Sequence, residues 1–384
     1  MIGYLKTIAA ALAALAIVFA APAQAQSNWQ GVSRIVVIGD LHGDYEKFAD
    51  ILSDASVIDA AGDWIGGPTH LVQLGDIPDR GANSRAIMDL LRRIEPQARR
   101  AGGYVHALIG NHEAMNVEGD LRYVHPGEYA AFADRRSARR RSQFYRRTMD
   151  YLRKHPPEGG LPVFDDAFRA QWDLEHPLGY VEHRAAWAPS GMYGRWAAGH
   201  DAIIRINNTL FLHGGLGPSF VDAEREAMNS AVRAALRGRP VAAYSDILTN
   251  QEGPLWYRGL ALNSAATERA HVEALLARHG VSRIVVGHTK RASTVLPRFG
   301  GRVVLADIAV PSGYTDPRAY LIIENGAAST IHRGARVALT ASTPAETCAY
   351  FARIAALDPP DGPNAALQAT CAAPDSAIAI APAP

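Results

Sequence analysis

The hydrophobic positions of the chain form short apolar runs that alternate with segments of helical periodicity. In the N-terminal third the apolar runs predict strands at 34–38, 71–74 and 104–109. The first run is followed by Phe48, Ile51 and Leu52 on one helical face, and the second by a helical pattern over 84–94. Strands that alternate with helices in this way predict an α/β fold built in layers.

The same pattern returns in the second half of the chain. The predicted strands there are 202–206, 209–212, 282–286, 303–307 and 319–323, and the predicted helices are about 221–236 and 267–279. Asn207-Asn208 separates the first two of these strands and predicts a hairpin turn. We therefore expect one folded domain over 31–335 and a C-terminal tail over 336–384. The last dozen residues, rich in Ala and Pro, are expected to be disordered.

Between about 120 and 196 the alternation is lost, and we expect a helical insertion in this part of the domain. Arginines cluster there beside Phe144 and Tyr145, at Arg135, Arg136, Arg139, Arg140, Arg141, Arg146 and Arg147. One interpretation is a solvated, basic helix face. The other is a lid or docking surface for an acidic or phosphorylated partner. The sequence leaves both interpretations open.

The composition is that of a globular protein with an ordinary core, since 48% of the 384 residues are hydrophobic and 20% are charged. The formal net charge of +1 gives no global attraction toward nucleic acid or membranes, and no nucleic-acid partner is expected.

The N-terminus has the pattern of a secretory signal peptide. Lys6 precedes an apolar run over 8–21, and Ala23-Gln24-Ala25 matches an A-x-A cleavage site. We expect a signal peptide over 1–25, export to the periplasm or the medium, and no stable membrane span after cleavage; an uncleaved N-terminal anchor is the alternative. The two cysteines, Cys348 and Cys371, could then form a disulfide.

Polar side chains with catalytic potential follow five of the predicted strands, each beside a glycine. They are Asp40 with His42, Asp76 with Asp79 and Arg80, Asn111 with His112, His213, and His288. In an open α/β sheet, ligands bind outside the carboxyl ends of the strands. Carboxylate, amide and imidazole ligands suit divalent metals such as Mn, Fe or Zn. The loop from Asp76 to Arg80 could by itself be a salt-bridged turn, but the repetition over independent strand ends favours one shared metal site.

Such a site predicts hydrolysis of a phosphate ester. Two metals that share a carboxylate would hold a bridging hydroxide and clamp the oxygens of an in-line phosphoryl displacement. His112 could supply the proton to the leaving alkoxide, with Asp79 as the nearest carboxylate to orient it. The planar guanidinium of Arg80 could hold the phosphate.

Three motifs carry a family resemblance. They are Gly-Asp-Leu-His-Gly at 39–43, Gly-Asp-Ile-Pro-Asp-Arg-Gly at 75–81 and Gly-Asn-His-Glu at 110–113. They resemble the signature motifs of the calcineurin-like metallophosphoesterases, and the Asp-Arg-Gly and Asn-His-Glu endings resemble the phosphoprotein phosphatase branch. Within that branch the runs at 111–116, 212–215 and 253–258 are similar to the Shewanella-like protein phosphatases. The resemblance covers about 35–323.

The resemblance implies a β-sandwich flanked by helices, and a role for each matching residue. Asp40 and His42 would bind one metal, Asp76 would bridge, and Asn111, His213 and His288 would bind the second. His112 would be the general acid, paired with Asp79, while Arg80, Arg258 and Asn111 would contact the phosphate. The alternative for Arg258 is a surface arginine after a buried Trp-Tyr pair.

The chain departs from eukaryotic members of the branch at one loop. It lacks their Ser-Ala-Pro-Asn-Tyr run and has Asp-Ile-Ala-Val-Pro-Ser-Gly at 307–313 in the corresponding place, so subunit and toxin binding linked to that loop are not implied.

The expected function is a metal-dependent phosphomonoesterase for phosphoproteins or phosphopeptides, with phosphotyrosine and phosphoserine or phosphothreonine both open. The alternatives are a hydrolase of nucleotides or other small phosphate esters, a metal- or phosphate-binding protein without activity, and a nucleic-acid binder on the arginine cluster.

Overall fold

The computed structural model describes residues 26–308, 318–362, 364–369 and 371. The expected signal peptide and the final dozen residues lie outside the described residues, as does most of the 307–313 loop. Within the described residues no helix has both the length and the apolar character needed to cross a membrane.

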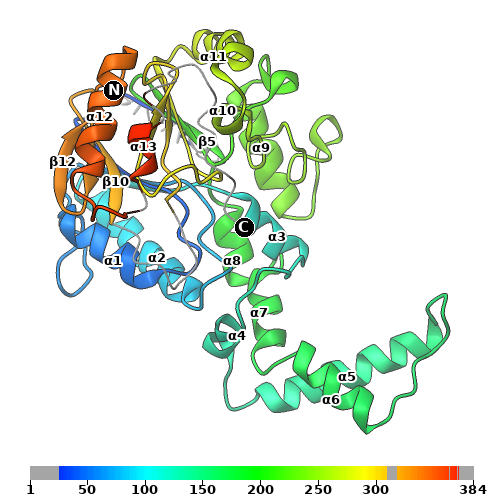
Figure 1. Ribbon diagram of the computed structural model, residues 1–384. Coiled ribbons are helices and arrows are strands. Elements are labelled where there is room, and N and C mark those ends of the chain that lie inside the picture. Colours follow the sequence, from blue (N-terminus) through cyan, green and yellow to red (C-terminus); the bar gives the residue numbers. More distant parts are fainter. Residues whose placement is uncertain (1–25, 309–317, 363, 370, 372–384) are drawn as a thin grey trace, which may run out of the picture.

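Two mixed sheets flanked by helices form the body of the protein (Figure 1), as the α/β expectation and the implied sandwich require. In the described residues one sheet has the order β1-β5-β6-β7-β9-β8 and the other β12-β11-β10-β2-β3-β4. The strands of the first sheet are β1 (Asn28–Trp29), β5 (Ile203–Ile206), β6 (Thr209–Leu212), β7 (Arg283–Val286), β8 (Leu296–Arg298) and β9 (Val303–Leu305). Those of the second are β2 (Arg34–Ile38), β3 (His70–Gln73), β4 (Tyr104–Ala107), β10 (Ala319–Glu324), β11 (Ala327–His332) and β12 (Ala335–Ala338).

The strand directions place the polar loops on one side of the molecule. Strands β2, β3 and β4 are mutually parallel, as are β6 and β7. The loops that leave their carboxyl ends therefore meet at a common edge. Both sheets share one hydrophobic core, in which Val36 and Leu71 of the second sheet lie in the same cluster as Phe211 and Val285 of the first.

The helices that cover the sheets agree with the helical patterns of the sequence. They are α1 (Tyr45–Asp54), α2 (Ser84–Arg100), α3 (Asn111–Glu118), α9 (Arg225–Leu236), α10 (Gly259–Leu262) and α11 (Ala265–His279). Phe48, Ile51 and Leu52 are buried on α1 as expected. Helix α2 continues beyond the predicted end at 94, through Pro96, because Ala98 in its last turn is still buried. The predicted hairpin is present, since β5 and β6 pair antiparallel across Asn207.

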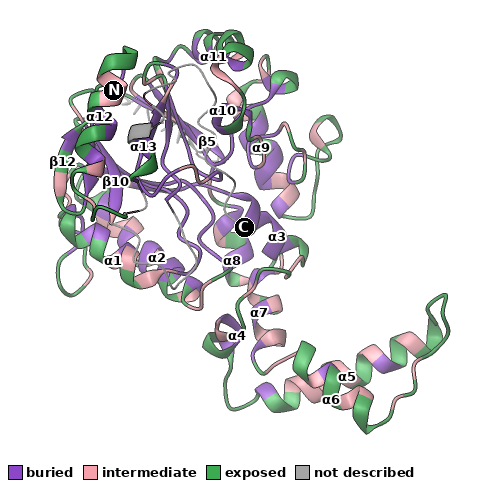
Figure 2. Ribbon diagram, in the orientation of Figure 1, coloured by how far each residue is buried: buried purple, intermediate pink, exposed green. Residues whose placement is uncertain are grey.

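Residues 126–197 form five helices, and two of them extend away from the body as an arm (Figure 1). The five are α4 (Pro126–Phe132), α5 (Ser137–Lys154), α6 (Asp166–Glu175), α7 (Tyr180–Trp187) and α8 (Met192–Ala197). We define the arm as α5, α6 and the loop between them. Only Ser137 and Met149 of α5 are buried, and Figure 2 shows the arm mostly exposed or half-buried.

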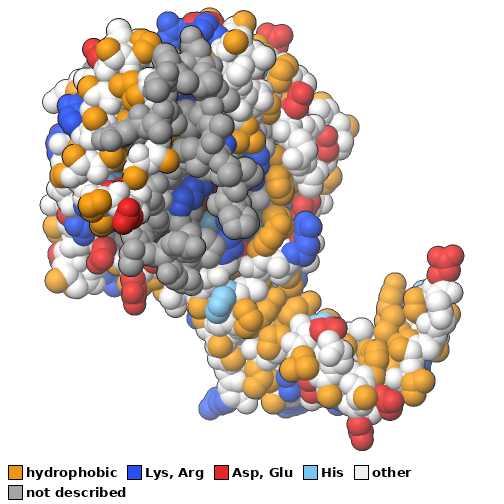
Figure 3. Space-filling model, viewed as in Figure 1, with side chains coloured by type: hydrophobic (Ala, Val, Ile, Leu, Met, Phe, Trp, Pro, Cys, Tyr) orange, Lys and Arg blue, Asp and Glu red, His pale blue; other side chains and the backbone are white. Residues whose placement is uncertain are grey.

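The arm is held together by its own side chains and is also linked to α7. Within the arm, Phe144 packs on Trp172 and Arg141 pairs with Asp173, while Arg140 pairs with Glu182 of α7. The rest of the arginine cluster is exposed, and Figure 3 shows hydrophobic side chains on the arm as well. Both interpretations of the cluster stay open.

The region assigned to the tail begins within β12 and contains helix α12 (Pro344–Ala355) and the short α13 (Ala366–Ala369). Helix α12 starts with a capping box between Thr343 and Glu346 and buries Tyr350 in the core. A disulfide joins Cys348 of α12 to Cys371. At least residues 336–355 therefore pack on the domain.

Candidate active site

Apart from Arg258, which caps the N-terminus of α10, every candidate residue lies on a loop or helix start after a strand. Asp40 and His42 follow β2, Asp76 to Arg80 follow β3, and Asn111 and His112 open α3 after β4. His213 follows β6 and His288 follows β7, so the two sheets supply opposite sides of one site.

The loops hold several of these residues in strained backbone conformations. The non-glycine residues with positive φ include His42 (46°), Asp76 (56°), Asp79 (76°), Arg80 (63°) and His288 (63°). Each such residue costs about 1–3 kcal/mol and persists only where its surroundings fix it. Here the amides of Leu41 and His42 both donate to the carbonyl oxygen of Asp76, at 3.0 and 2.9 Å. The two loops thus fix one another.

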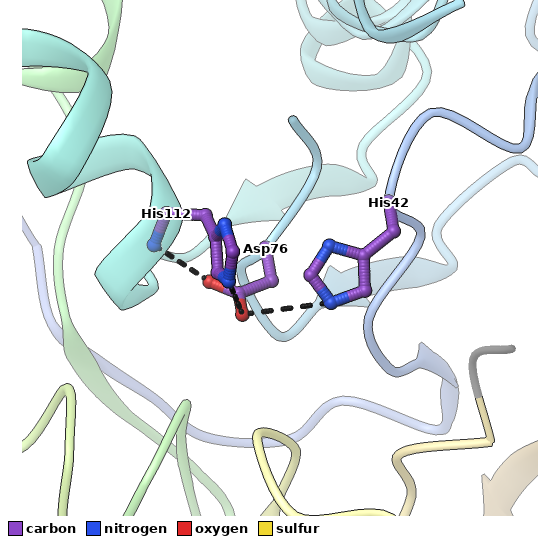
Figure 4. Close-up of side chains that lie close together, drawn as sticks. All are labelled: His42, Asp76 and His112. Carbon is purple, nitrogen blue, oxygen red and sulfur yellow. Dashed lines mark hydrogen bonds and ion pairs between the residues drawn. The ribbon is translucent and has the colours of Figure 1, made fainter. Parts of the chain in front are cut away.

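Two groups of side chains in this site could each hold a metal ion, and Asp76 belongs to both. The groups are His42, Asp76 and His112, and Asp76, His213 and His288; the ligand atoms of each group lie within 4.8 Å of one another. Figure 4 shows Asp76 between His42 and His112, with its Oδ2 3.8 Å from His42 Nε2 and 3.7 Å from His112 Nε2. Its Oδ1 lies 3.3 Å from His213 Nε2. This is the position that a bridging carboxylate requires.

Asp40 and Asn111 complete the ring of potential ligands. Asp40 Oδ2 lies 3.9 Å from His42 Nε2, and its Oδ1 lies 3.9 Å from His213 Nδ1. Asn111 Oδ1 lies 3.0 Å from His213 Nε2. The structure therefore brings together the six residues that the sequence assigned to the metals.

The imidazole rings are oriented by backbone carbonyls behind the site. His42 Nδ1 lies 3.1 Å from the oxygen of Pro78, His213 Nδ1 2.9 Å from that of Leu74, and His288 Nε2 3.1 Å from that of Trp256. A ring nitrogen that faces a carbonyl must donate its hydrogen, which leaves the lone pair of the other nitrogen directed inward.

The inward lone pairs fit a cation. His213 Nε2 and His288 Nδ1 lie only 3.1 Å apart, where two lone pairs repel each other unless a proton or a metal ion lies between or beside them. Burial lowers the pKa of His213, but the charges of Asp76 and Asp40 outweigh it and raise that pKa to about 9. The same field that holds a proton on His213 favours a metal ion. Burial lowers the pKa of His42 to about 3 and that of His288 well below its usual value, so both stay neutral ligands.

The carboxylates also need a cation. Burial, followed by the nearby charge of Asp307, raises the pKa of Asp40 well above its ordinary value. Asp307 is buried at the end of β9, on the described part of the 307–313 loop. Several carboxylates in one buried site are stabilised when divalent metals bind.

His112 has the environment of a proton donor. Its Nδ1 lies 2.6 Å from Asp79 Oδ2, and its Nε2 faces Asp76 across the site. Burial lowers the pKa of His112, but Asp76 and Asp79 outweigh that effect and raise it. Asn116 Nδ2 donates to the other oxygen of Asp79 at 2.9 Å, which fixes the carboxylate.

The sequence motifs assigned no role to two supporting residues. Asn116 is one, and it lies one helical turn after His112 on α3. The other is Glu113, whose buried carboxylate accepts the amides of Gly110, Asp76 and Ile77 at 2.8, 3.0 and 2.8 Å. Local signals for both residues exist in the sequence. Glu113 is the third residue of the helix, where a capping-box carboxylate lies, and Asn116 is four residues after His112, on the same helix face.

The two arginines lie at the mouth of the site. Arg80 is exposed, and its backbone amide donates to the carbonyl of Tyr123 at 2.8 Å. Arg258 Nη1 donates to the carbonyl of His288 at 2.7 Å and to Thr289 Oγ1 at 3.0 Å. Arg258 is therefore attached to a ligand-bearing loop.

Comparison with known proteins agrees with this geometry. Residues 33–292 match the model of the calcineurin-like phosphoesterase family. The chain is similar to Shewanella-like protein phosphatase 2 of Arabidopsis thaliana, at 29% identity over 76% of this chain and 75% of that protein. It is also similar to an uncharacterized protein of Schizosaccharomyces pombe, at 30% identity over 77% and 79% of the two chains.

A solved structure is similar as well. It is that of a cold-active protein-tyrosine phosphatase from a psychrophilic Shewanella species, with a TM-score of 0.61, 27% identity and 82% of each chain covered. The family and these relatives identify the protein as a phosphatase, and its His and Asp groups are consistent with a dinuclear metal site. The chain belongs to the calcineurin-like phosphoesterase family.

Proposed function

We propose that the protein is an exported phosphatase that hydrolyses phosphate monoesters of phosphoproteins or phosphopeptides, on tyrosine or on serine and threonine. The observation that carries the proposal is that Asp76 lies between His42 on one side and His213 with His288 on the other, and also faces His112, which is itself paired with Asp79. This arrangement supports a role for His112 as the proton donor to a phosphate ester held beside Asp76.

Six residues would hold two divalent metals, of which Mn, Fe and Zn all suit the donor set. They are Asp40, His42, Asp76, Asn111, His213 and His288. When bound, such metals activate water near neutral pH and neutralise the phosphate oxygens.

The protein supplies orientation and proton transfer. The guanidinium groups of Arg80 and Arg258 bind the phosphate oxygens from the mouth of the site, and Asn111 contacts them from within. His112 donates the proton from Nε2 to the leaving oxygen. Asp79 holds the Nδ1 hydrogen of His112 and so fixes the ring and keeps it protonated.

The names of the relatives support a phosphopeptide substrate. One is called a protein phosphatase and another a protein-tyrosine phosphatase, and each covers three quarters or more of this chain. Export is supported by the signal-peptide pattern at 1–25 and by the disulfide between Cys348 and Cys371, since structural disulfides are typical of oxidising compartments.

The test uses the protein from residue 26 onward, loaded in turn with Mn, Fe and Zn. Its kcat/KM is measured on a phosphotyrosine peptide, the matching phosphoserine peptide and a dinucleotide polyphosphate. We expect turnover of at least one peptide to exceed that of the dinucleotide, and His112→Asn to lower it by about 10²–10⁴ with the metal content unchanged. A preference for the dinucleotide, or full activity of His112→Asn, would overturn the proposal.

A further inference from the structure

An exposed tyrosine borders the proton donor of the site. Tyr123 lies in the segment between α3 and α4, and 45% of its surface is exposed. The centroid of its ring lies 5.3 Å from that of the His112 ring, with 53° between the planes. A half-exposed aromatic ring beside the proposed proton donor offers an apolar face that a ligand can cover.

Backbone hydrogen bonds hold the turn that carries this ring. The carbonyl oxygen of Tyr123 accepts the amide of Arg80 at 2.8 Å, and the amide of Val124 donates to Leu121 in the same turn. Arg80 is itself held in a left-handed conformation. The backbone of Tyr123 is thus held beside the proposed phosphate-binding arginine, and the Cζ of Arg80 lies 5.9 Å from the ring centroid of Tyr123.

The position of the ring decides what it can contact. The leaving oxygen of a substrate must come within about 2.6–3.2 Å of His112 Nε2 to receive its proton. The group bonded to that oxygen therefore lies next to His112, where the ring of Tyr123 is within reach.

In phosphotyrosine the group bonded to the oxygen is a flat, rigid ring. It can pack against Tyr123 at the centroid separations of about 4.5–7 Å that aromatic pairs adopt. In phosphoserine the oxygen carries only a methylene group, which is too small to cover the ring.

We propose that Tyr123 is a specificity-determining residue that favours aryl phosphate esters, and phosphotyrosine in particular, over alkyl phosphate esters. This inference rests on the proposed phosphatase function and adds to it a residue that sets the preference between its aryl and alkyl substrates. An aromatic contact of this kind changes kcat/KM for the aryl substrate by about two- to tenfold.

Three variants test the role of the ring. Tyr123→Leu removes the aromatic ring but keeps an apolar side chain and the backbone bond to Arg80. Tyr123→Phe keeps the ring. Tyr151→Leu is the matched control, because Tyr151 is also exposed, at 60%, but lies on the arm. The measurement is the ratio of kcat/KM for a phosphotyrosine peptide to that for the same peptide with phosphoserine, together with inhibition by inorganic phosphate.

We expect Tyr123→Leu to lower this ratio by about two- to tenfold, while Tyr123→Phe and Tyr151→Leu retain it. Inhibition by inorganic phosphate should be unchanged in all three, since the phosphate contacts remain. An unchanged ratio in Tyr123→Leu would overturn the inference even if the enzyme is a phosphopeptide phosphatase. If the parent protein hydrolyses neither peptide, the proposed function itself fails, which is a different result.

Discussion

Replacing Asp79 by Asn should shift the pH dependence of catalysis more than it affects folding. The Asp79 carboxylate lies 2.6 Å from His112 Nδ1 and accepts the Asn116 amide on its other oxygen. Asn at position 79 has nearly the same shape but no charge. A hydrogen bond to a charged group contributes about 1.5–3 kcal/mol, and one pKa unit corresponds to about 1.36 kcal/mol. The pKa of His112 should therefore fall by about one to two units.

The sign of the effect follows from the role of His112. Its raised pKa keeps the ring protonated as the pH increases. If His112 is the proton donor as proposed, activity is lost when the proton leaves. With a lower pKa this loss begins at lower pH, so the alkaline limb of the pH profile of kcat should move down by about one to two units. The decrease in kcat should be largest for a phosphotyrosine or phosphoserine peptide. It should be smaller for an aryl phosphate whose leaving group is more acidic, because that leaving group needs less protonation.

A matched control is Asn116→Ala, which removes the amide that fixes Asp79 but keeps the carboxylate charge. Its alkaline limb should stay within about half a unit of that of the parent enzyme. If Asp79→Asn kept the parental alkaline limb and the parental dependence on the leaving group, Asp79 would not control the proton on His112 and the assignment of the pair would be wrong.

Three further predictions follow from the structure. Asp76→Asn should lose bound metal and activity together, as measured by elemental analysis and peptide turnover; retention of both metals would contradict its bridging position. Cys348→Ser, which removes the disulfide to Cys371, should lower the free energy of unfolding in urea by about 2–4 kcal/mol and make it insensitive to reductant; unchanged stability would show that the cross-link contributes nothing. Burial lowers the pKa of His70 from 6.5 to about 4 and also that of its neighbour His106, so the unfolded chain takes up protons first as the pH falls. The free energy of unfolding should thus decrease from about pH 6.5 toward pH 4. This decrease should be shallower when His70 and His106 are both replaced by Gln; an equal decrease would show that the two histidines do not cause it.

Much of the fold could be predicted because its signals are local. The apolar runs at 34–38 and 209–212 agree with β2 and β6 to the residue. The convergence of the candidate site residues could be predicted for a related reason: parallel strands end at one edge, so polar residues after each strand lie close together. His213 was thus placed with Asn111, which lies 102 residues away in the chain.

The elements that were not predicted have weak apolar patterns. Strands β11 and β12 contain small and charged residues, and they are stable because they continue the sheet beside β10. A local signal existed, since Asn325-Gly326 occupies the turn between β10 and β11 with positive φ at both residues. Helix α12 lies in an Ala-rich segment that was not predicted as a helix. It is held against the domain by Tyr350, whose hydroxyl donates to the carbonyl of Val295.

By itself, the sequence determined the layered α/β fold, the loops that carry the site and the chemistry of their ligands, because periodicity, glycines and residue types act over a few positions. Only the tertiary structure decided which atoms meet. It directed the inward nitrogens of His213 and His288 toward each other, gave Glu113 three backbone amides to bind, and placed the ring of Tyr123 beside His112. These contacts depend on distances between segments that are remote in the chain, and no local pattern encodes such distances.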